Sequence, residues 1–292
     1  MVVADLVLLL ANVVYATSYV AVRVTVDDVP PATLAFVRLV VGALILLPLG
    51  ARAERVPPRP GDTGRVVAMG LVGFAAAYAL AHWGILHSTA THAALLIVIE
   101  PVALMLLAPL VLGERLARRD GAAAVLALLG ATLVVVNGMP GGSPGGLLPH
   151  WRGDALLVLS AVAFAAYSLL GRAILTRHNA ARVTRQSIAW GAAGLAPLAI
   201  AEWLSGQRPV WTPTAVAGTL YLAIVISALG YLVWNWALAR VEASRAATFL
   251  TVQPLGGAVL GVLLLGETVT VFTVTGASLI VAGLCMTVRW GR

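Results

Sequence analysis

The sequence contains no lysine, a single cysteine and few charged residues of any kind. Only 11% of its 292 residues are charged, whereas soluble domains carry about 25%. Because 60% of the residues are hydrophobic and the mean hydropathy is +0.96, the composition excludes an ordinary soluble domain and predicts an integral membrane protein. The lone Cys285 excludes an intramolecular disulfide and argues against a cysteine-based metal cluster, and its apolar neighbours predict a packing role.

The positive charge of the chain comes from arginine alone. Nineteen basic against twelve acidic residues give a net charge of +7, which in a soluble protein would suggest a nucleic-acid partner. Here the arginines lie between apolar runs, where they act as topology signals facing anionic lipid headgroups. We therefore expect a lipid bilayer and no nucleic acid as partner. No cleavable signal is expected, because Asp5 precedes the first apolar stretch and no basic segment comes before it.

Apolar runs recur along the whole chain with short polar interruptions. A helix needs roughly 20 mostly apolar residues to cross the hydrocarbon core, and ten runs come close to that length. They predict an all-α integral membrane protein with ten transmembrane helices. The predicted spans are 5–24, 33–49, 65–86, 91–112, 121–137, 153–175, 184–204, 213–237, 244–265 and 270–288.

The distribution of arginine predicts how these helices enter the membrane. If the N-terminus is cytoplasmic, fifteen of the nineteen arginines fall in inner segments and three in outer ones, while Arg38 lies within a span. Cytoplasmic loops carry the excess of positive charge. We therefore expect both termini inside, and a multi-pass protein of the inner (plasma) membrane of a bacterium.

The chain repeats itself at a nearly constant offset, which predicts two related halves. The first half covers 1–138, a linker rich in glycine and proline covers 139–152, and the second half covers 153–292. Each half holds five spans, and because five is odd the second half should be inverted relative to the first. The matching pairs are Tyr78/Tyr231, Trp83/Trp236, Pro101/Pro254 and Gly130/Gly283 at an offset of 153, and Asp5/Asp154, Arg23/Arg172, Gly42/Gly191 and Pro48/Pro197 at an offset of 149.

Particular motifs resemble those of a known family. Glu100-Pro101 precedes LVLGERL, Gln253-Pro254 precedes LLLGETV, and the second half opens with GDALLVLSAVAFAAYSLLGRAI. On these motifs the chain is similar to the drug/metabolite transporter superfamily, in its ten-span EamA-like branch. The resemblance implies a non-enzymatic transporter without cofactor or metal. The chain departs from the pattern at Ala123, where the second half has Gly276, and in its first span, which lacks a Trp-Gly pair.

Glu100 is the one carboxylate predicted deep within a span. Ionisable groups in hydrocarbon cost about 2.5–3.5 kcal/mol at a helix centre, so those that persist usually face a cavity. Pro101 removes a backbone donor and is expected to kink the helix and to leave the Ile97 carbonyl free. Two roles are open for Glu100: a coupling group that binds a proton or cation beside the substrate, or a neutral carboxyl that holds the kink. The symmetric Gln253-Pro254 pair marks a second helix break and cannot titrate.

Polar residues at helical spacing predict the lining of a substrate cavity. Tyr78 and His82 share one helix face, and Tyr231 and Asn235 share the corresponding face of the other half. Interhelical hydrogen bonding is the alternative for these side chains. We interpret Trp83, Trp234 and Trp236 as an interfacial aromatic belt. The remaining candidate substrate-binding residues are Asn12, Tyr15, Tyr19, Tyr167, Ser168, Thr248, Thr251 and Gln253.

Three further features are assigned from the sequence. Arg38 is expected to snorkel to the headgroups, toward Asp27 or Asp28, with binding of a substrate carboxylate as the alternative. His87 and His92 are expected to be polar residues at an outer loop. Gly257 and Gly261 form a GxxxG spacing that predicts close approach of another helix.

These features favour a secondary transporter over other classes of membrane protein. The predicted function is export of a small polar metabolite such as an amino acid by alternating access between two inverted halves. The alternatives are a multidrug efflux carrier of the same fold, a channel or structural subunit, and an intramembrane enzyme, for which no catalytic motif is present. The expected partners are a small-molecule substrate and the bilayer, with protons as candidate coupling ions and a monomer or homodimer as the assembly.

Overall fold

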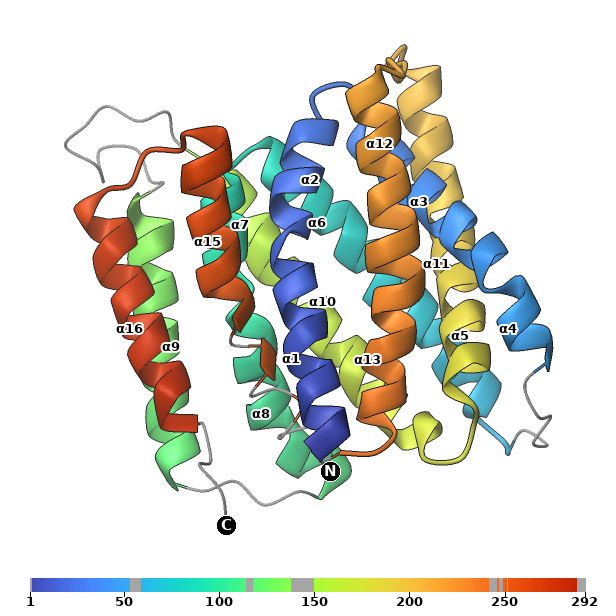
Figure 1. The fold of residues 1–292 in the computed structure, drawn as a ribbon, viewed down its shortest axis with the longest axis horizontal. Coiled ribbons are helices and arrows are strands. Elements are labelled where there is room, and N and C mark those ends of the chain that lie inside the picture. The colour runs from blue at the N-terminus through green and yellow to red at the C-terminus, as the bar shows by residue number, and fades with distance from the viewer. Residues whose placement is uncertain are drawn as a thin grey trace.

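The structure is a computed structural model that describes residues 2–52, 59–113, 118–137, 150–241, 246, 249–250 and 252–287. Every regular element within these ranges is a helix, and the helices form one elongated bundle (Figure 1). They are α1 Val2–Ala16, α2 Ser18–Thr25, α3 Pro31–Ile45, α4 Leu47–Arg52, α5 Asp62–Gly70, η1 Leu71–Ala76, α6 Ala77–Leu86, α7 Ala90–Leu96, α8 Ile99–Leu112, α9 Arg118–Asn137, α10 Trp151–Leu175, α11 Ala180–Leu204, α12 Pro213–Tyr221, η2 Leu222–Gly230, α13 Tyr231–Leu238, α15 Val252–Leu265 and α16 Val271–Thr287.

The outside of the bundle is suited to hydrocarbon. Six helical stretches are long and apolar enough to cross a membrane, and four shorter apolar helices, of 10–17 residues, occupy the other predicted positions. Large apolar side chains point outward, among them Leu110, Leu204 and Val271, which are each at least 80% exposed. An exposed apolar surface of this extent would promote aggregation in water but matches lipid. The chain is therefore a multi-pass membrane protein.

The twin Leu-Gly-Glu motifs end equivalent helices in the same way. Gly113 follows α8 with φ 71° and Gly266 follows α15 with φ 64°, a left-handed conformation that glycine adopts without a Cβ penalty. Glu267 then turns back and accepts hydrogen bonds from the backbone N–H groups of Ala90 and Thr91, both at 2.7 Å. This carboxylate therefore satisfies the free donors at the start of α7.

The contacts between the two halves have the reciprocity of a two-fold axis. A Cβ on Gly130 would lie 2.5 Å from the Gly276 carbonyl oxygen, and a Cβ on Gly283 would lie 2.7 Å from the Ala123 carbonyl oxygen. Gly130 and Gly283 are equivalent in the repeat, as are Ala123 and Gly276. The contact that the first half makes with the second is thus repeated by the equivalent residues in the opposite direction, as in an isologous interface.

The same reciprocity recurs at the centre of the bundle. A Cβ added to Gly42 would lie 3.4 Å from the carbonyl oxygen of Ala223 in η2. A Cβ added to the equivalent residue of the other half, Gly191, would lie 3.2 Å from the carbonyl oxygen of Gly70. The π-helical segments η1 and η2 lie at matching places in the third and eighth predicted spans. Such segments are rare and often occur at functional sites.

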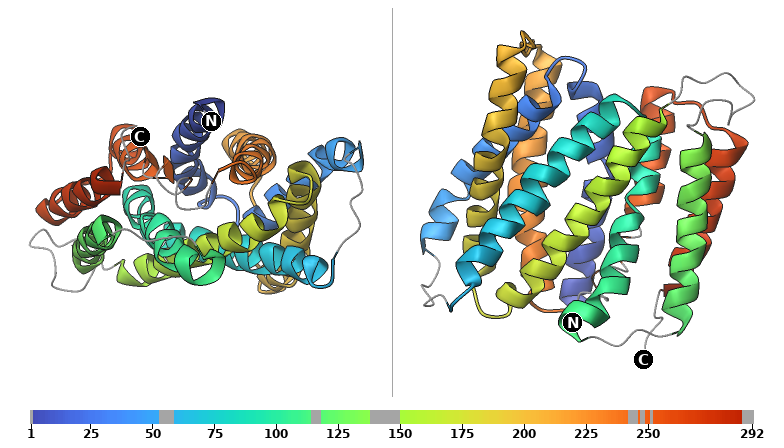
Figure 2. Two further views of the ribbon diagram at one scale, coloured as in Figure 1. Left: turned by 90° about the horizontal axis from the view of Figure 1, so that it is seen from below. Right: turned by 180° about the vertical axis from the view of Figure 1, so that it is seen from behind.

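Helices α9 and α16 form a pair at one side of the bundle (Figures 1 and 2), and small residues let them pack closely. We expect Gly130→Ala to lower the melting temperature of the detergent-solubilised protein by several degrees. The added methyl group would meet the Gly276 carbonyl and the Ile280 backbone within 3 Å, and overpacking of this kind costs about 1–3 kcal/mol. Gly121→Ala is the matched control, because it lies on the same helix and its Cβ would meet nothing within 4 Å. Equal melting temperatures for the two variants would contradict the close packing.

Candidate functional site

A cavity of about 90 Å³ lies at the centre of the bundle, between helices of both halves. Nine of the candidate residues predicted from the sequence line it: Tyr15, Tyr19, Tyr78, His82, Glu100, Tyr167, Ser168, Tyr231 and Gln253. A volume of this size admits several water molecules. Apolar side chains from α6, α10 and η2 form much of the remaining wall, a composition typical of small-molecule sites.

Other candidate residues do not line the cavity. Asn12 accepts a hydrogen bond from Gln253 Nε2 at 2.6 Å, and the Gln253 Oε1 atom accepts one from the Tyr19 hydroxyl at 2.9 Å. Asn235 donates to the Tyr167 hydroxyl and to Thr184 at 2.6 and 2.8 Å. For the two asparagines the structure therefore favours interhelical hydrogen bonding. The predicted Thr248 and Thr251 lie outside the described residues.

The fourth predicted span is broken beside the cavity. Helix α7 ends at Leu96 and α8 begins at Ile99, so the interruption lies in the turn before Pro101, which is the third residue of α8. The Ile97 carbonyl, predicted to be free, accepts a hydrogen bond from the Glu100 N–H at 2.8 Å. Pro254 is likewise the third residue of α15. A proline is tolerated in a first turn because the N–H it lacks would have no partner there.

Glu100 faces the cavity from the first turn of α8. Its residue is 8% exposed, and no described residue donates a hydrogen bond to its carboxylate. The N-terminal end of a helix favours negative charge. Within the described part of the chain, no hydrogen bond from a neighbouring helix holds this carboxyl in place.

Arg38 also faces the cavity, which contradicts the expectation that it snorkels to the headgroups. It is 2% exposed, and its predicted partners are engaged elsewhere: Asp27 pairs with Arg23 at 2.6 Å, and Asp28 accepts a hydrogen bond from Thr212. The side chain turns inward because neutral acceptors surround it there. Among the described residues no carboxylate lies within ion-pair distance of the guanidinium.

Three neutral groups orient the Arg38 guanidinium. Its Nε donates to Ser227 at 2.9 Å, and its Nη2 donates to the Tyr78 hydroxyl at 3.3 Å. Its Nη1 lies 3.1 Å from His82 Nε2, while His82 Nδ1 faces the Pro31 carbonyl at 3.1 Å. This pairing assigns the His82 hydrogen to Nδ1 and makes Nε2 the acceptor. A guanidinium has five donors, so two of them have no acceptor among the described residues.

The symmetric tyrosines meet at the centre of the site. The rings of Tyr78 and Tyr231 are 6.4 Å apart, and Tyr231 also contacts Tyr15 at 5.8 Å and Tyr167 at 5.4 Å in edge-to-face geometry. Two equivalent residues that touch each other lie close to the axis that relates them. Edge-to-face pairs contribute about 0.5–1.5 kcal/mol each beyond burial, so the cluster is both a wall of the cavity and a joint between the halves.

Two hydroxyl groups of the lining lack a partner. The Tyr15 hydroxyl and the Ser168 hydroxyl are buried and form no hydrogen bond within the described part of the chain. Buried polar groups are nearly always satisfied, and an exception indicates a missing ligand or water. Together with Glu100 and the remaining donors of Arg38, these hydroxyls give the cavity both hydrogen-bond donors and acceptors that have no partner among the described residues.

Several smaller expectations are corrected or confirmed. Trp234 is buried at 3% exposure and lines the cavity, so it does not belong to an aromatic belt. His92 is buried in a polar network and is not a surface cap, and Cys285 is exposed rather than packed. Gly257 and Gly261 do admit close helix approach: their added Cβ atoms would lie 2.5 Å from Ala94 and 2.6 Å from Thr91 of α7.

Comparison with known proteins finds transporters and a shared fold along nearly the whole chain. Residues 2–136 and 151–289 each match the EamA-like transporter family. A "Probable terminal-alkyne amino-acid exporter" of Streptantibioticus cattleyicolor is 31% identical over 285 residues, which cover 96% of this chain and 91% of that protein. A "Probable amino-acid metabolite efflux pump" of Salmonella typhimurium is 27% identical, with 96% and 93% covered. A solved crystal structure shares the fold with a TM-score of 0.70 and 21% identity, over 98% of this chain and 96% of the other.

Proposed function

The chain belongs to the EamA-like transporter family, and from that premise we propose that it exports an amino acid, bound as a zwitterion in the central cavity. The relatives named as amino-acid exporters support the substrate class. We place the protein in the inner membrane of a bacterium, with family repeats at 1–138 and 153–292 joined by the linker 139–152.

The observation that carries this proposal is the pair of ionisable groups that face one cavity with no ionic partner among the described residues. Arg38 has two free donors and no described carboxylate beside it, and Glu100 has no described donor. Charges removed from water need compensation. An α-carboxylate suits the planar guanidinium, which binds carboxylates through paired hydrogen bonds, and an α-ammonium suits Glu100. A single amino acid supplies both.

The same observation disfavours a carrier of hydrophobic cationic drugs. Such a drug could bind Glu100 and stack on the tyrosines, but it would leave Arg38 uncompensated and would be repelled by it. The aromatic cluster around Tyr231 suits the apolar part of an amino-acid side chain instead. We therefore assign specificity for the head group to Arg38 and Glu100, and contact with the side chain to the aromatic wall.

For the transport cycle we propose alternating access with both termini on the cytoplasmic side. Its support is the reciprocal packing of the halves and the broken helix α7–α8 beside the cavity, features typical of inverted-repeat carriers. In a Cys285→Ser background, single cysteines at Thr63 and Thr268, both exposed, should react with a membrane-impermeant maleimide from opposite sides. Labelling of both from the same side would reject the orientation.

Counterflow in proteoliposomes tests the function. Vesicles loaded with one unlabelled amino acid should accumulate the labelled form transiently above its external concentration, with saturable initial rates. A channel would equilibrate without this overshoot, and an enzyme would show no flux. If none of the twenty amino acids gives counterflow with folded protein, the proposal is wrong. A thermal-shift screen against amino acids identifies the substrate to use first, because a ligand that binds the folded state raises its stability.

A further inference from the structure

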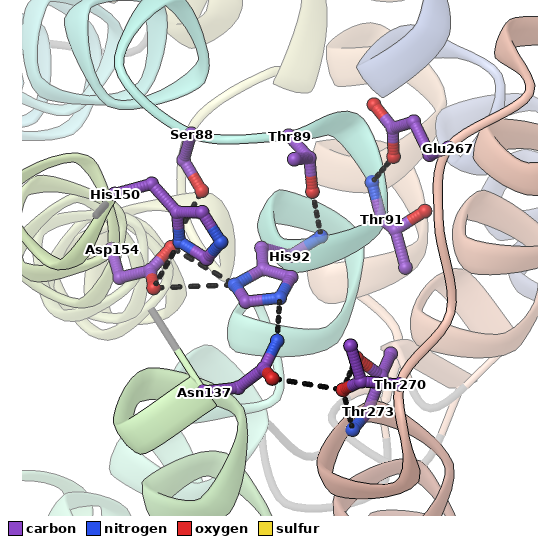
Figure 3. A network of polar contacts seen from close by, with 10 residues as sticks. All are labelled: Ser88, Thr89, Thr91, His92, Asn137, His150, Asp154, Glu267, Thr270 and Thr273. Carbon is purple, nitrogen blue, oxygen red and sulfur yellow. Dashed lines mark hydrogen bonds and ion pairs between the residues drawn. The ribbon is translucent and has the colours of Figure 1, made fainter. Parts of the chain in front are cut away.

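A second buried polar cluster lies apart from the cavity, where α7 and α10 begin (Figure 3). His92 comes from the first turn of α7, His150 directly precedes α10, and Asp154 is in the first turn of α10. From these positions both imidazoles converge on one carboxylate (Figure 3). We propose that His92, His150 and Asp154 form a binding site for a divalent transition-metal ion, with Zn²⁺ as the best match.

The distances within the cluster match the edges of a coordination polyhedron. Nδ1 of His92 lies 3.2 Å from each Asp154 oxygen, and Nδ1 of His150 lies 3.2 Å from Oδ2. Hydrogen bonds between charged partners are shorter, about 2.7–2.9 Å, and the separate His178–Asp62 pair of this chain shows 2.9 Å. Ligands at about 2.0–2.2 Å from a tetrahedral zinc are about 3.3 Å apart. The separations in the cluster are closer to that value.

The three donor atoms can meet around one ion. One ring nitrogen of each histidine and one Asp154 oxygen all lie within 4.8 Å of one another. His150 is the most accessible of the three ligands, because its side chain is 13% exposed and the residue lies just before the first turn of α10. Asp154 and His92 are 0% and 5% exposed and supply a fixed half of the site.

The kinds of ligand select the kind of metal. Two imidazoles and one carboxylate suit zinc and neighbouring transition metals, whereas calcium and magnesium prefer sets of oxygen ligands. Three protein ligands leave a fourth position for water. The start of α10 favours an ionised Asp154, and the Ser88 hydroxyl, which donates to Oδ1 at 2.6 Å, orients that carboxylate.

A second layer of side chains fits the metal-bound state. When Nδ1 of His92 ligates a metal, its Nε2 carries the hydrogen and needs an acceptor. Nε2 faces the Asn137 amide at 3.4 Å, and the other end of that amide accepts from Thr270 at 2.8 Å (Figure 3). Turning the amide over presents its oxygen to His92 and its nitrogen to the Thr270 hydroxyl, which can donate to Thr273 at 3.1 Å. Asn137 thus satisfies His92 in either state.

A metal here would tie two helices of the transporter together. Glu267 already holds the first turn of α7 through Ala90 and Thr91, and the ion would join that turn to the start of α10. Helix α7 is the first part of the broken helix whose second part carries Glu100. A bound ion would therefore fix the N-terminal end of the α7–α8 segment, which lines the cavity.

Zinc binding to purified protein tests the site without any transport assay. The full chain, prepared without a polyhistidine tag and stripped with a chelator, is titrated with Zn²⁺ in detergent and dialysed, and the retained metal is counted. We expect about one equivalent and a higher melting temperature for the wild type. His178→Ala, which removes a histidine–carboxylate pair elsewhere in the chain, should behave like the wild type in zinc binding, whereas His150→Ala should retain none.

Two further variants keep the result interpretable. Asp154→Asn preserves the size of the side chain and should also lose zinc, and Asn137→Ala should weaken binding about 10-fold to 100-fold because it removes an outer partner of a ligand. Melting in chelator identifies any variant that fails to fold. Cobalt bound to the wild type should give the visible absorption of a four-coordinate site. Equal zinc retention by folded wild type, His150→Ala and Asp154→Asn, or none by the wild type, would overturn the proposal.

Discussion

Replacing Arg38 with Gln should abolish amino-acid counterflow and raise the Kd for the substrate 30-fold or more. The variant removes the buried cation that we assign to the substrate carboxylate, and truncating one partner of such a charge pair costs about 2–5 kcal/mol. Because each 1.4 kcal/mol is a tenfold change in Kd, the lower end of this range corresponds to about 30-fold. In the wild type Arg38 donates hydrogen bonds to both Ser227 and Tyr78, and the shorter glutamine side chain cannot form both at once. Binding to detergent-solubilised protein and initial rates in vesicles measure the two effects.

Arg23→Gln is the control for this experiment. Arg23 is partly exposed, lies outside the cavity and pairs with Asp27 four residues away. Because such surface pairs contribute about 0–1 kcal/mol, the Kd of the Arg23→Gln protein for the substrate should be unchanged. Arg38→Lys should bind weakly, because an ammonium keeps the charge but lacks the planar pair of donors. An Arg38→Gln protein with the affinity of the wild type would remove Arg38 from the substrate site.

Replacing Glu100 with Gln should weaken binding of the amino acid at least tenfold and should abolish any dependence of transport on a pH gradient. Glu100 is the only carboxylate that lines the cavity within the described residues, so it is the group available both to bind an ammonium and to exchange a proton. Insertion and folding should be retained, since no described residue bonds to this carboxylate. Counterflow with and without an imposed gradient separates substrate binding from coupling.

The deaminated analogue of the substrate sharpens this second prediction. An acid without the amino group can bind Arg38 but has nothing to offer Glu100, so Glu100→Gln should not weaken its binding. Asp27→Asn, an exposed carboxylate outside the cavity, is the control for loss of a negative charge. Full retention of gradient dependence by Glu100→Gln would exclude Glu100 from coupling, and equal losses for both ligands would exclude it as the partner of the ammonium.

Periodicity and internal repetition predict the helices of this protein and the residues that meet at its centre. Tyr78 and Tyr231 could be paired from the sequence alone, because equivalent residues on polar helix faces have few places to go except the interface between the halves. The close approach of α15 to α7 follows from Gly257 and Gly261 in the same way, since only small residues permit it. Helical periodicity, repeat-related positions and the spacing of small residues can all be read from the sequence, because they depend on neighbouring residues or on the repeat and not on distant contacts.

Arg38 and His92 could not be placed in this way, because tertiary contacts decide where their side chains point. A long arginine near the end of a span can extend to the headgroups or turn inward, and its acceptors Ser227 and His82 are distant in sequence. His92 follows what looks like an outer loop, but α7 begins at Ala90 and carries it inward toward Asp154. The available signal was that Arg38 is the arginine predicted deepest within a span, and such residues usually mark a site.

Binding of three matched ligands to the wild-type protein tests the central claim most directly. They are the amino acid that gives the largest thermal shift, the amine that lacks its carboxylate, and the acid that lacks its amino group. If Arg38 and Glu100 hold the two charges of a zwitterion, the amino acid binds at least tenfold more tightly than either analogue. Equal affinity for the amino acid and for one of the analogues would contradict the account.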